Sequence, residues 1–199
     1  MAITSASGAR PRGAARREAL LDAVLRIVAE VGADAVTHRR VAEEAGLPLA
    51  STTYYFDSKE HLLTAALERA AERDIARLHA FLAEADDELT DPLALAIDAI
   101  LDPVQETALS CRTSLVATYS LMLEAARRPA LRAVNRRWTD AYLDAVSRLL
   151  ERAGSADPRG DAAILLAVTD GLLVEQLASD RTAAARPQLE RVAAALVKR

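Results

Sequence analysis

Residues 36–63 read VTHRRVAEEAGLPLASTTYYFDSKEHLL, and this stretch decides how the chain folds. Thr37 suits the N-cap of a short helix that ends at Gly46, because threonine accepts backbone N–H groups and glycine readily adopts left-handed backbone angles. A second short helix is predicted over residues 48–55, and Asp57 is then expected to cap a longer helix. Two short helices joined by a tight turn are typical of a helix-turn-helix, whose second helix enters the DNA major groove.

The composition indicates a helical protein that can bury its own core. The chain has 199 residues, of which 51% are hydrophobic and only 4% aromatic. This favours helix over strand and is enough for one large or two small domains. The single cysteine, Cys111, excludes an intrachain disulfide, and no cluster of cysteine and histidine suggests a metal. No apolar run approaches the ~20 residues of a membrane span, so we expect a cytoplasmic protein without a membrane contact.

The net charge of −4 is distributed unevenly along the chain. Residues 1–63 carry eight basic and eight acidic side chains, so the whole acidic excess lies in the remainder. Four arginines precede the first acid, Glu18, and two of them, Arg10 and Arg12, lie in residues 1–13, which are predicted to form a basic, disordered arm. Such an arm can attract phosphate whatever the total charge, because the attraction depends on where the cations lie. A solvated tail without a partner is the alternative interpretation.

Helices are predicted over almost all of the chain beyond this stretch. The spacing of apolar residues and the positions of prolines predict helices over 16–31, from 57 onward, and at roughly 91–102, 105–127, 129–153, 158–179 and 187–198. Pro103 and Pro129 are expected to break or kink what would otherwise be longer helices. The segment 162–177 is apolar on nearly every face. A helix of that kind must be covered on all sides, which suggests that a second copy of the chain supplies part of the cover.

The first four predicted helices resemble the DNA-binding domain of the TetR family of transcriptional regulators. The resemblance covers residues 14–68 and rests on the helix and turn of 37–46, on the aromatic run 54–56 and on Ser-Lys-Glu at 58–60. It implies an all-α protein with an N-terminal three-helix helix-turn-helix DNA-binding domain over 14–63. A C-terminal helical domain over 64–199 would bind a ligand and form a dimer. This second part resembles the family only in its length and helical character.

The resemblance also implies which residues contact DNA. The positions that commonly face bases are Leu49, Ala50 and Ser51, and Arg39 matches a position that in relatives can reach a guanine edge. The positions that hold the phosphate backbone are Thr37, Thr53, Tyr55 and Lys59. Lys59 opposes the dipole at the start of its helix, which favours a functional reason for it.

Several of these residues have a second interpretation. Arg39, like its neighbour Arg40, could be an ordinary solvated charge on a helix. Tyr54 and Phe56 are expected to be core residues, whereas Tyr55 is expected to reach phosphate. His38 is interpreted as a surface residue rather than a sensor. The operator sequence stays open, because the residues expected to face bases are apolar or small.

For the C-terminal part, the resemblance implies a small-molecule effector and a homodimer. The dimer is expected to form through helices near 158–179 and 187–198. Candidate ligand-binding residues are Cys111, Tyr119, Met122, Trp138, Tyr142 and Asp170, with ordinary core packing as the alternative for most of them. Asp170 lies within the apolar helix, where a carboxylate needs a partner, either at the dimer interface or on a polar ligand.

The predicted function is therefore a sequence-specific DNA-binding regulator, a repressor that an effector releases from its operator. The alternative is an all-helical ligand-binding or adaptor protein that does not bind an operator. An enzyme is not favoured, because the chain has no Ser/His/Asp arrangement, phosphate loop or paired-carboxylate motif. For the same reason we expect no catalytic residue, cofactor or metal.

Overall fold

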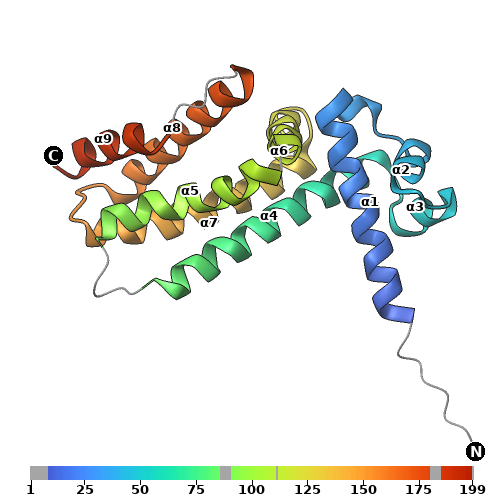
Figure 1. Ribbon diagram of the computed structural model, residues 1–199, viewed down its shortest axis with the longest axis horizontal. Helices are drawn as coiled ribbons and strands as arrows, with labels where there is room; N and C mark the ends of the chain where they lie inside the picture. The colour runs from blue at the N-terminus through green and yellow to red at the C-terminus, as the bar shows by residue number, and fades with distance from the viewer. Residues whose placement is uncertain (1–8, 86–90, 111, 180–184, 199) are drawn as a thin grey trace, which may run out of the picture. The chain divides into compact units, whose positions relative to one another are not determined.

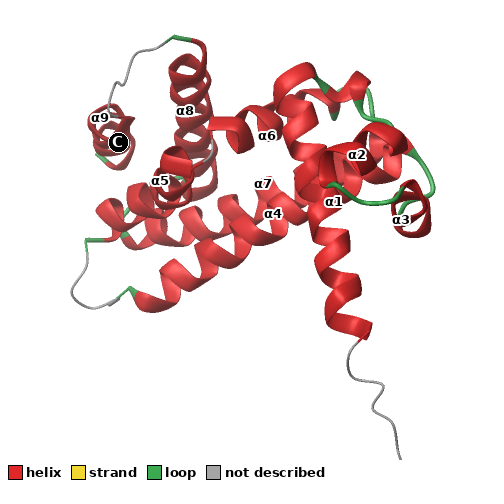
Figure 2. Ribbon diagram, turned by 45° about the vertical axis from the view of Figure 1, so that its right-hand side comes forward, coloured by secondary structure: helices red, strands yellow, loops and turns green. Residues whose placement is uncertain are grey.

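The computed structural model describes residues 9–85, 91–110, 112–179 and 185–198, and these are helical with short connections (Figure 2). No strand occurs within these ranges, which confirms the predicted all-α fold class. The elements in chain order are α1 (Ala9–Val31), the 3₁₀ turn η1 (Ala33–Ala35), α2 (His38–Ala45), α3 (Leu49–Tyr55), α4 (Lys59–Glu84), α5 (Pro92–Ser110), α6 (Arg112–Glu124), α7 (Pro129–Arg152), α8 (Pro158–Ala178) and α9 (Ala185–Val197).

The contacts divide the chain into two compact units. The first unit contains residues 1–70 and 113–135, and the second contains residues 71–112 and 136–199. Helix α4 therefore begins in the first unit and ends in the second. Helix α6 belongs to the first unit, with the helix-turn-helix, although it is distant from it in sequence.

The first unit is built on α1, against which α2 and α3 pack (Figure 1). Leu20, Val24, Ile27 and Val28 of α1 recur every three or four positions and are buried, as the sequence spacing predicts for one face of a helix, whereas Val31 at the end of the helix is 52% exposed. Phe56, from the segment between α3 and α4, joins the same core. The largest buried side chains of this unit are Leu20, Leu21, Ile27, Phe56, Leu62, Leu63, Leu67, Leu121 and Leu131.

The turn between α2 and α3 forms as the sequence predicts. The hydroxyl oxygen of Thr37 accepts a hydrogen bond from the Arg40 backbone N–H at 3.2 Å, which caps the start of α2. Gly46 ends α2 with a φ of 63°, in the left-handed region that glycine adopts without strain. The backbone N–H of Leu47 then donates to the Ala42 carbonyl at 2.9 Å. These local bonds fix the angle at which α3 leaves the turn.

The cap of α4 differs from the sequence prediction. Ser58, not Asp57, is the capping residue, since its hydroxyl accepts from the His61 N–H at 3.1 Å. The Asp57 backbone N–H instead donates to Nδ1 of His61 at 3.3 Å. Serine and aspartate can both cap a helix. Because Ser58 is the capping residue, α4 begins at Lys59, one residue later than expected.

Two other predicted boundaries are wrong. Helix α1 begins at Ala9, so residues 9–13 of the expected arm are helical, while residues 1–8 lie outside the described part. Helix α5 continues through Pro103 to Ser110, where a break was predicted. A proline inside a helix removes one backbone hydrogen bond, and burial of the preceding turns, from Leu95 to Leu101, offsets that loss.

The second unit has its own core, formed by the second half of α4 with α5, α7, α8 and α9. Fully buried members include Leu78, Val146, Leu150, Leu165 and Leu189. Helix α8 begins as predicted, with the Asp157 carboxylate accepting from the Gly160 N–H at 3.1 Å and Pro158 in the first turn. Among the described residues, none of the helices has the length and apolar character that crossing a membrane requires.

Candidate nucleic-acid interface and effector residues

The start of α3 presents side chains that are apolar or small to solvent. Leu49 is 50% exposed, Ala50 is exposed and Ser51 is half-buried. The orientation is fixed by Thr52, which is completely buried and whose hydroxyl donates to the Leu49 carbonyl at 2.8 Å. A helix N-terminus with small side chains lets the backbone approach base edges and phosphates closely. The three residues expected to face bases are therefore brought together on one accessible surface.

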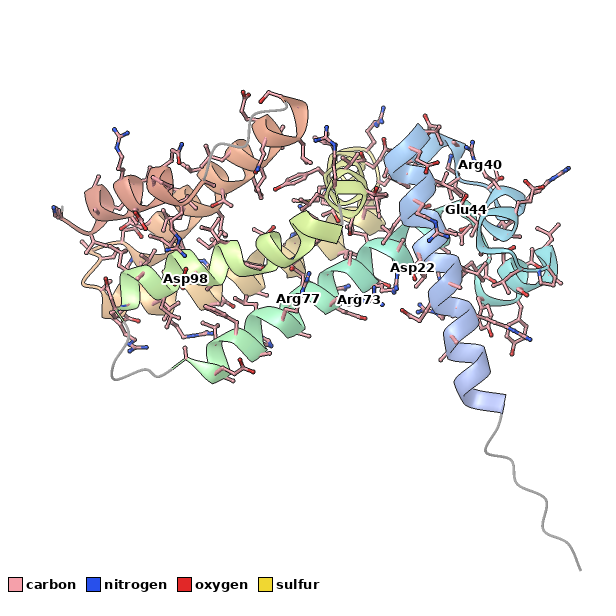
Figure 3. The ribbon with its side chains drawn as sticks, in the orientation of Figure 1. Asp22, Arg40, Glu44, Arg73, Arg77 and Asp98 are labelled. Carbon is pink, nitrogen blue, oxygen red and sulfur yellow. The ribbon has the colours of Figure 1, made fainter. Side chains whose placement is uncertain are left out.

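Arg39 and Arg40 are exposed on α2, the helix before the turn; Arg40 is labelled in Figure 3. The Nε–H of Arg39 donates to the Glu43 carboxylate at 2.8 Å, one helical turn away. This hydrogen bond, reinforced by the charge of Glu43, raises the pKa of Arg39 above its ordinary value. The Arg39 side chain therefore lies along α2 beside Glu43.

The aromatic residues 54–56 at the end of α3 point in different directions, and one of them differs from the prediction. Phe56 is buried as predicted, but Tyr54 is 80% exposed, so the prediction that it is a core residue is wrong. The reason is helical geometry: with Thr52 facing inward, Tyr54 lies roughly 200° around the helix, on the opposite side. The Tyr55 hydroxyl donates to the Gly13 carbonyl of α1 at 3.1 Å. Tyr54 is therefore a large exposed aromatic side chain of α3, which the sequence pattern did not predict.

The phosphate-contact candidates already have partners within the chain. The Thr37 hydroxyl caps α2, and the Thr53 hydroxyl donates to the Ala50 carbonyl at 3.3 Å. The Lys59 ammonium donates to the Asp34 backbone carbonyl at 2.8 Å and lies 3.7 Å from the Asp34 carboxylate. The unfavourable position of Lys59 on its helix dipole therefore has a structural explanation in addition to the proposed contact with DNA.

Two arginines hold α1 against α2 and α4 through ion pairs. Arg26 of α1 donates from Nε to the Glu44 carboxylate of α2 at 2.6 Å (Glu44 is labelled in Figure 3). Arg69 of α4 is only 6% exposed and binds two carboxylates of α1, those of Glu18 and of Asp22, the latter at 2.6 Å. These contacts set the orientation of α1 relative to α2 and α4.

The ligand candidates do not form one cluster within either unit. Trp138 and Tyr142 converge on a residue that the sequence did not single out, Asp74 of α4, whose Oδ2 accepts from the Trp138 indole at 2.9 Å and from the Tyr142 hydroxyl at 2.8 Å. Tyr119 and Met122 are half-buried on α6, in the first unit. Cys111 lies outside the described residues.

Helix α8 has one buried and one exposed side. Leu165, Thr169 and Leu173 face the core of the second unit, while Ile164 and Val174 are 43% and 48% exposed. Asp170 is on the exposed side, so it does not line the interior of its own chain. A groove of about 530 Å³ runs beside this side of the helix, lined by Ile164, Gln188, Arg191, Val192, Ala195 and Leu196.

A capped α2, a left-handed turn and an α3 with an accessible start define a helix-turn-helix DNA-binding protein carrying a larger helical domain. Comparison with known families agrees at both ends of the chain. Residues 20–66 match the model described as bacterial regulatory proteins, tetR family, and residues 91–199 match the one described as the tetracyclin repressor-like C-terminal domain. The chain belongs to the TetR family of DNA-binding regulators.

Individual relatives are similar over different parts of the chain. The HTH-type transcriptional repressor KstR of Mycolicibacterium smegmatis is 47% identical over 58 residues, which cover only 29% of this chain and 28% of KstR. A TetR family structure from Streptomyces coelicolor A3 is 33% identical, covers 91% of this chain and 97% of its own, and has a TM-score of 0.70. The multidrug binding protein EbrR complexed with ethidium is also 33% identical, with 91% and 98% covered and a TM-score of 0.68.

Proposed function

We propose that this protein is a transcriptional repressor that binds a double-stranded DNA operator as a homodimer and is released from it by a small-molecule effector. The observation that carries the proposal is the accessible start of α3, held in place by the buried Thr52 and the Gly46 turn. In a helix-turn-helix this surface enters the major groove. The similarity to the transcriptional repressor KstR supports repression, and the similarity to EbrR, which was solved in complex with ethidium, supports binding of a small-molecule effector.

In this proposal Leu49, Ala50 and Ser51 face base edges and Arg39 reaches a base beside them. The phosphate backbone is held by Thr37, Thr53, Tyr55 and Lys59. Tyr54 joins this second group, because a phenol that is 80% exposed beside Thr53 can donate to a phosphate oxygen. Leu49 contributes an apolar surface that suits a thymine methyl group.

Operator binding is tested on the DNA upstream of the gene that encodes this protein. We expect binding whose affinity falls by at least about a thousandfold between 50 and 200 mM salt, because each neutralised phosphate releases counterions. Binding should be lost on an unrelated fragment of equal length. If no genomic fragment is bound at low salt, the chain acts instead as a ligand-binding or adaptor protein, and the repressor proposal fails.

The proposed dimer forms through α8 and α9. Ile164, Ala167, Gly171 and Val174 follow each other every three or four residues along the exposed side of α8. Among the residues that the structure describes, none outside this part of α8 lies within 4 Å of a Cβ placed at Gly171, so their packing does not require a glycine there. A mid-helix glycine costs about 0.5–1 kcal/mol relative to alanine, and the close approach of a partner helix would offset this cost.

The proposed effector binds in the helical C-terminal part of the chain, where Trp138 and Tyr142 are the candidate aromatic contacts. Trp138 is the only tryptophan of the chain, so its fluorescence reports on that region alone. With ethidium as the probe and without DNA, we expect saturable quenching of Trp138 emission. Ethidium binding that leaves Trp138 emission unchanged would contradict the proposed effector site beside Trp138, and so would the absence of ethidium binding.

A further inference from the structure

The contact between Lys59 and Asp34 is part of a larger ionic network in the first unit. The Asp34 carboxylate lies 3.7 Å from the Lys59 ammonium and 3.8 Å from the guanidinium of Arg128. Arg128 also donates to the Glu124 carboxylate at 2.9 Å, and Arg127 binds the same carboxylate. The hydrogen bond from Arg128 is the main reason that the pKa of Glu124 lies below its ordinary value. Cations and anions therefore alternate from α4 through η1 to the turn between α6 and α7.

Exposure separates the members of this network. The Asp34 side chain is 92% exposed, whereas the side chains of Lys59 and Arg128 are 34% and 26% exposed. An exposed carboxylate in contact with a cation contributes little to folding stability, because water competes for both charges. It nevertheless places a negative charge beside the lysine that is proposed to hold a DNA phosphate.

We propose that Asp34 lowers the affinity for operator DNA by competing with phosphate for Lys59, and that Arg128 weakens this competition by sharing the Asp34 carboxylate. The inference rests on the proposed function, since it needs Lys59 to contact phosphate. The chemistry allows the exchange. A lysine ammonium has three donors, so Lys59 can keep its 2.8 Å hydrogen bond to the Asp34 carbonyl while a phosphate oxygen replaces the carboxylate.

The position of Arg128 connects the ionic network to the C-terminal family domain. Arg128 lies within the segment that matches the C-terminal family domain, yet it belongs to the same compact unit as the helix-turn-helix. A change that moves the turn between α6 and α7 away from η1 would separate Arg128 from the Asp34 carboxylate, which would then interact with Lys59 only. DNA affinity would then fall, in the direction required for release of a repressor.

The test uses Asp34→Asn, which removes the negative charge but keeps the backbone carbonyl that binds Lys59. Its matched control is Glu30→Gln, an exposed acid at the end of α1 that undergoes the same change of charge. We expect Asp34→Asn to bind operator about two- to fivefold more tightly at 50 mM salt, an advantage that shrinks above 300 mM as the charges are screened. Glu30→Gln should gain clearly less.

Arg128 supplies the test that separates this network from a general effect of charge. Arg128→Gln should weaken operator binding about two- to threefold in the native background and have no effect in the Asp34→Asn background. If Asp34→Asn gains no more than Glu30→Gln, or if the effects of Arg128→Gln and Asp34→Asn are additive, the inference is overturned while the repressor proposal stands. Absence of operator binding by the unmodified protein would overturn both.

Discussion

Gly171→Arg is expected to leave the protein monomeric and to weaken operator binding by at least about a hundredfold. The substitution places a long cation in the middle of the exposed side of α8, where the proposed partner helix packs closely. A monomer contacts a single half-site and loses the gain of linking two contacts, which commonly reaches 10²–10⁴. Sedimentation velocity would measure the oligomeric state, and a shift assay on operator DNA would measure affinity.

The fold of the single protomer should survive this change, because no described side chain packs against the position of a Cβ at Gly171. Ala133→Arg, at an exposed alanine of α7, adds the same charge outside α8 and α9 and should remain dimeric. Gly171→Ala should raise helix stability within the protomer and weaken the dimer only modestly. A Gly171→Arg protein that sediments as a dimer would show that α8 does not form the interface as proposed.

Arg69→Ala is expected to lower the free energy of unfolding by about 2–4 kcal/mol. Removing one partner of a buried ion pair commonly costs 3–5 kcal/mol, and we expect a smaller value because Glu18 and Asp22 are nearly half exposed and water can solvate them. The lost aliphatic stem of a side chain that is only 6% exposed adds to the cost. Urea unfolding followed by circular dichroism would measure the change.

Arg69→Met separates packing from charge, since methionine keeps the buried stem and removes the guanidinium. We expect it to cost about half as much as Arg69→Ala. Arg136→Ala, at an exposed arginine of α7, should change stability by less than about 0.5 kcal/mol. A loss below about 1 kcal/mol for Arg69→Ala would mean that the two carboxylates of α1 do not hold α4 in the way the structure indicates.

The features that the sequence predicts correctly depend on residues within a few positions of each other. The caps at Thr37 and Asp157 and the left-handed turn at Gly46 are set by bonds that span three or four residues. The buried face of α1 follows from helical spacing alone. For this reason the layout of the helix-turn-helix, and with it the family, could be inferred without coordinates.

The features that the sequence does not predict depend on tertiary partners. Pro103 lies inside α5 because the turns before it are buried, and Asp74 matters because two side chains, 64 and 68 residues away in sequence, converge on it. Lys59 is the most informative case. Its conflict with the helix dipole indicated a function, but only the structure shows that Asp34 is beside it. Tyr54 could have been assigned outward by carrying the helical period of α3 through the aromatic run.

Entry of the start of α3 into the DNA major groove can be tested by adding a single negative charge to that surface. Ala50→Glu puts a carboxylate on the surface proposed to face base edges, and Ala83→Glu puts the same charge on the exposed side of α4. At 100 mM salt we expect Ala50→Glu to bind the upstream DNA at least about a hundredfold more weakly than the unmodified protein, with unchanged helicity, and Ala83→Glu to bind normally. Equal binding by Ala50→Glu and the unmodified protein would show that the start of α3 does not enter the major groove.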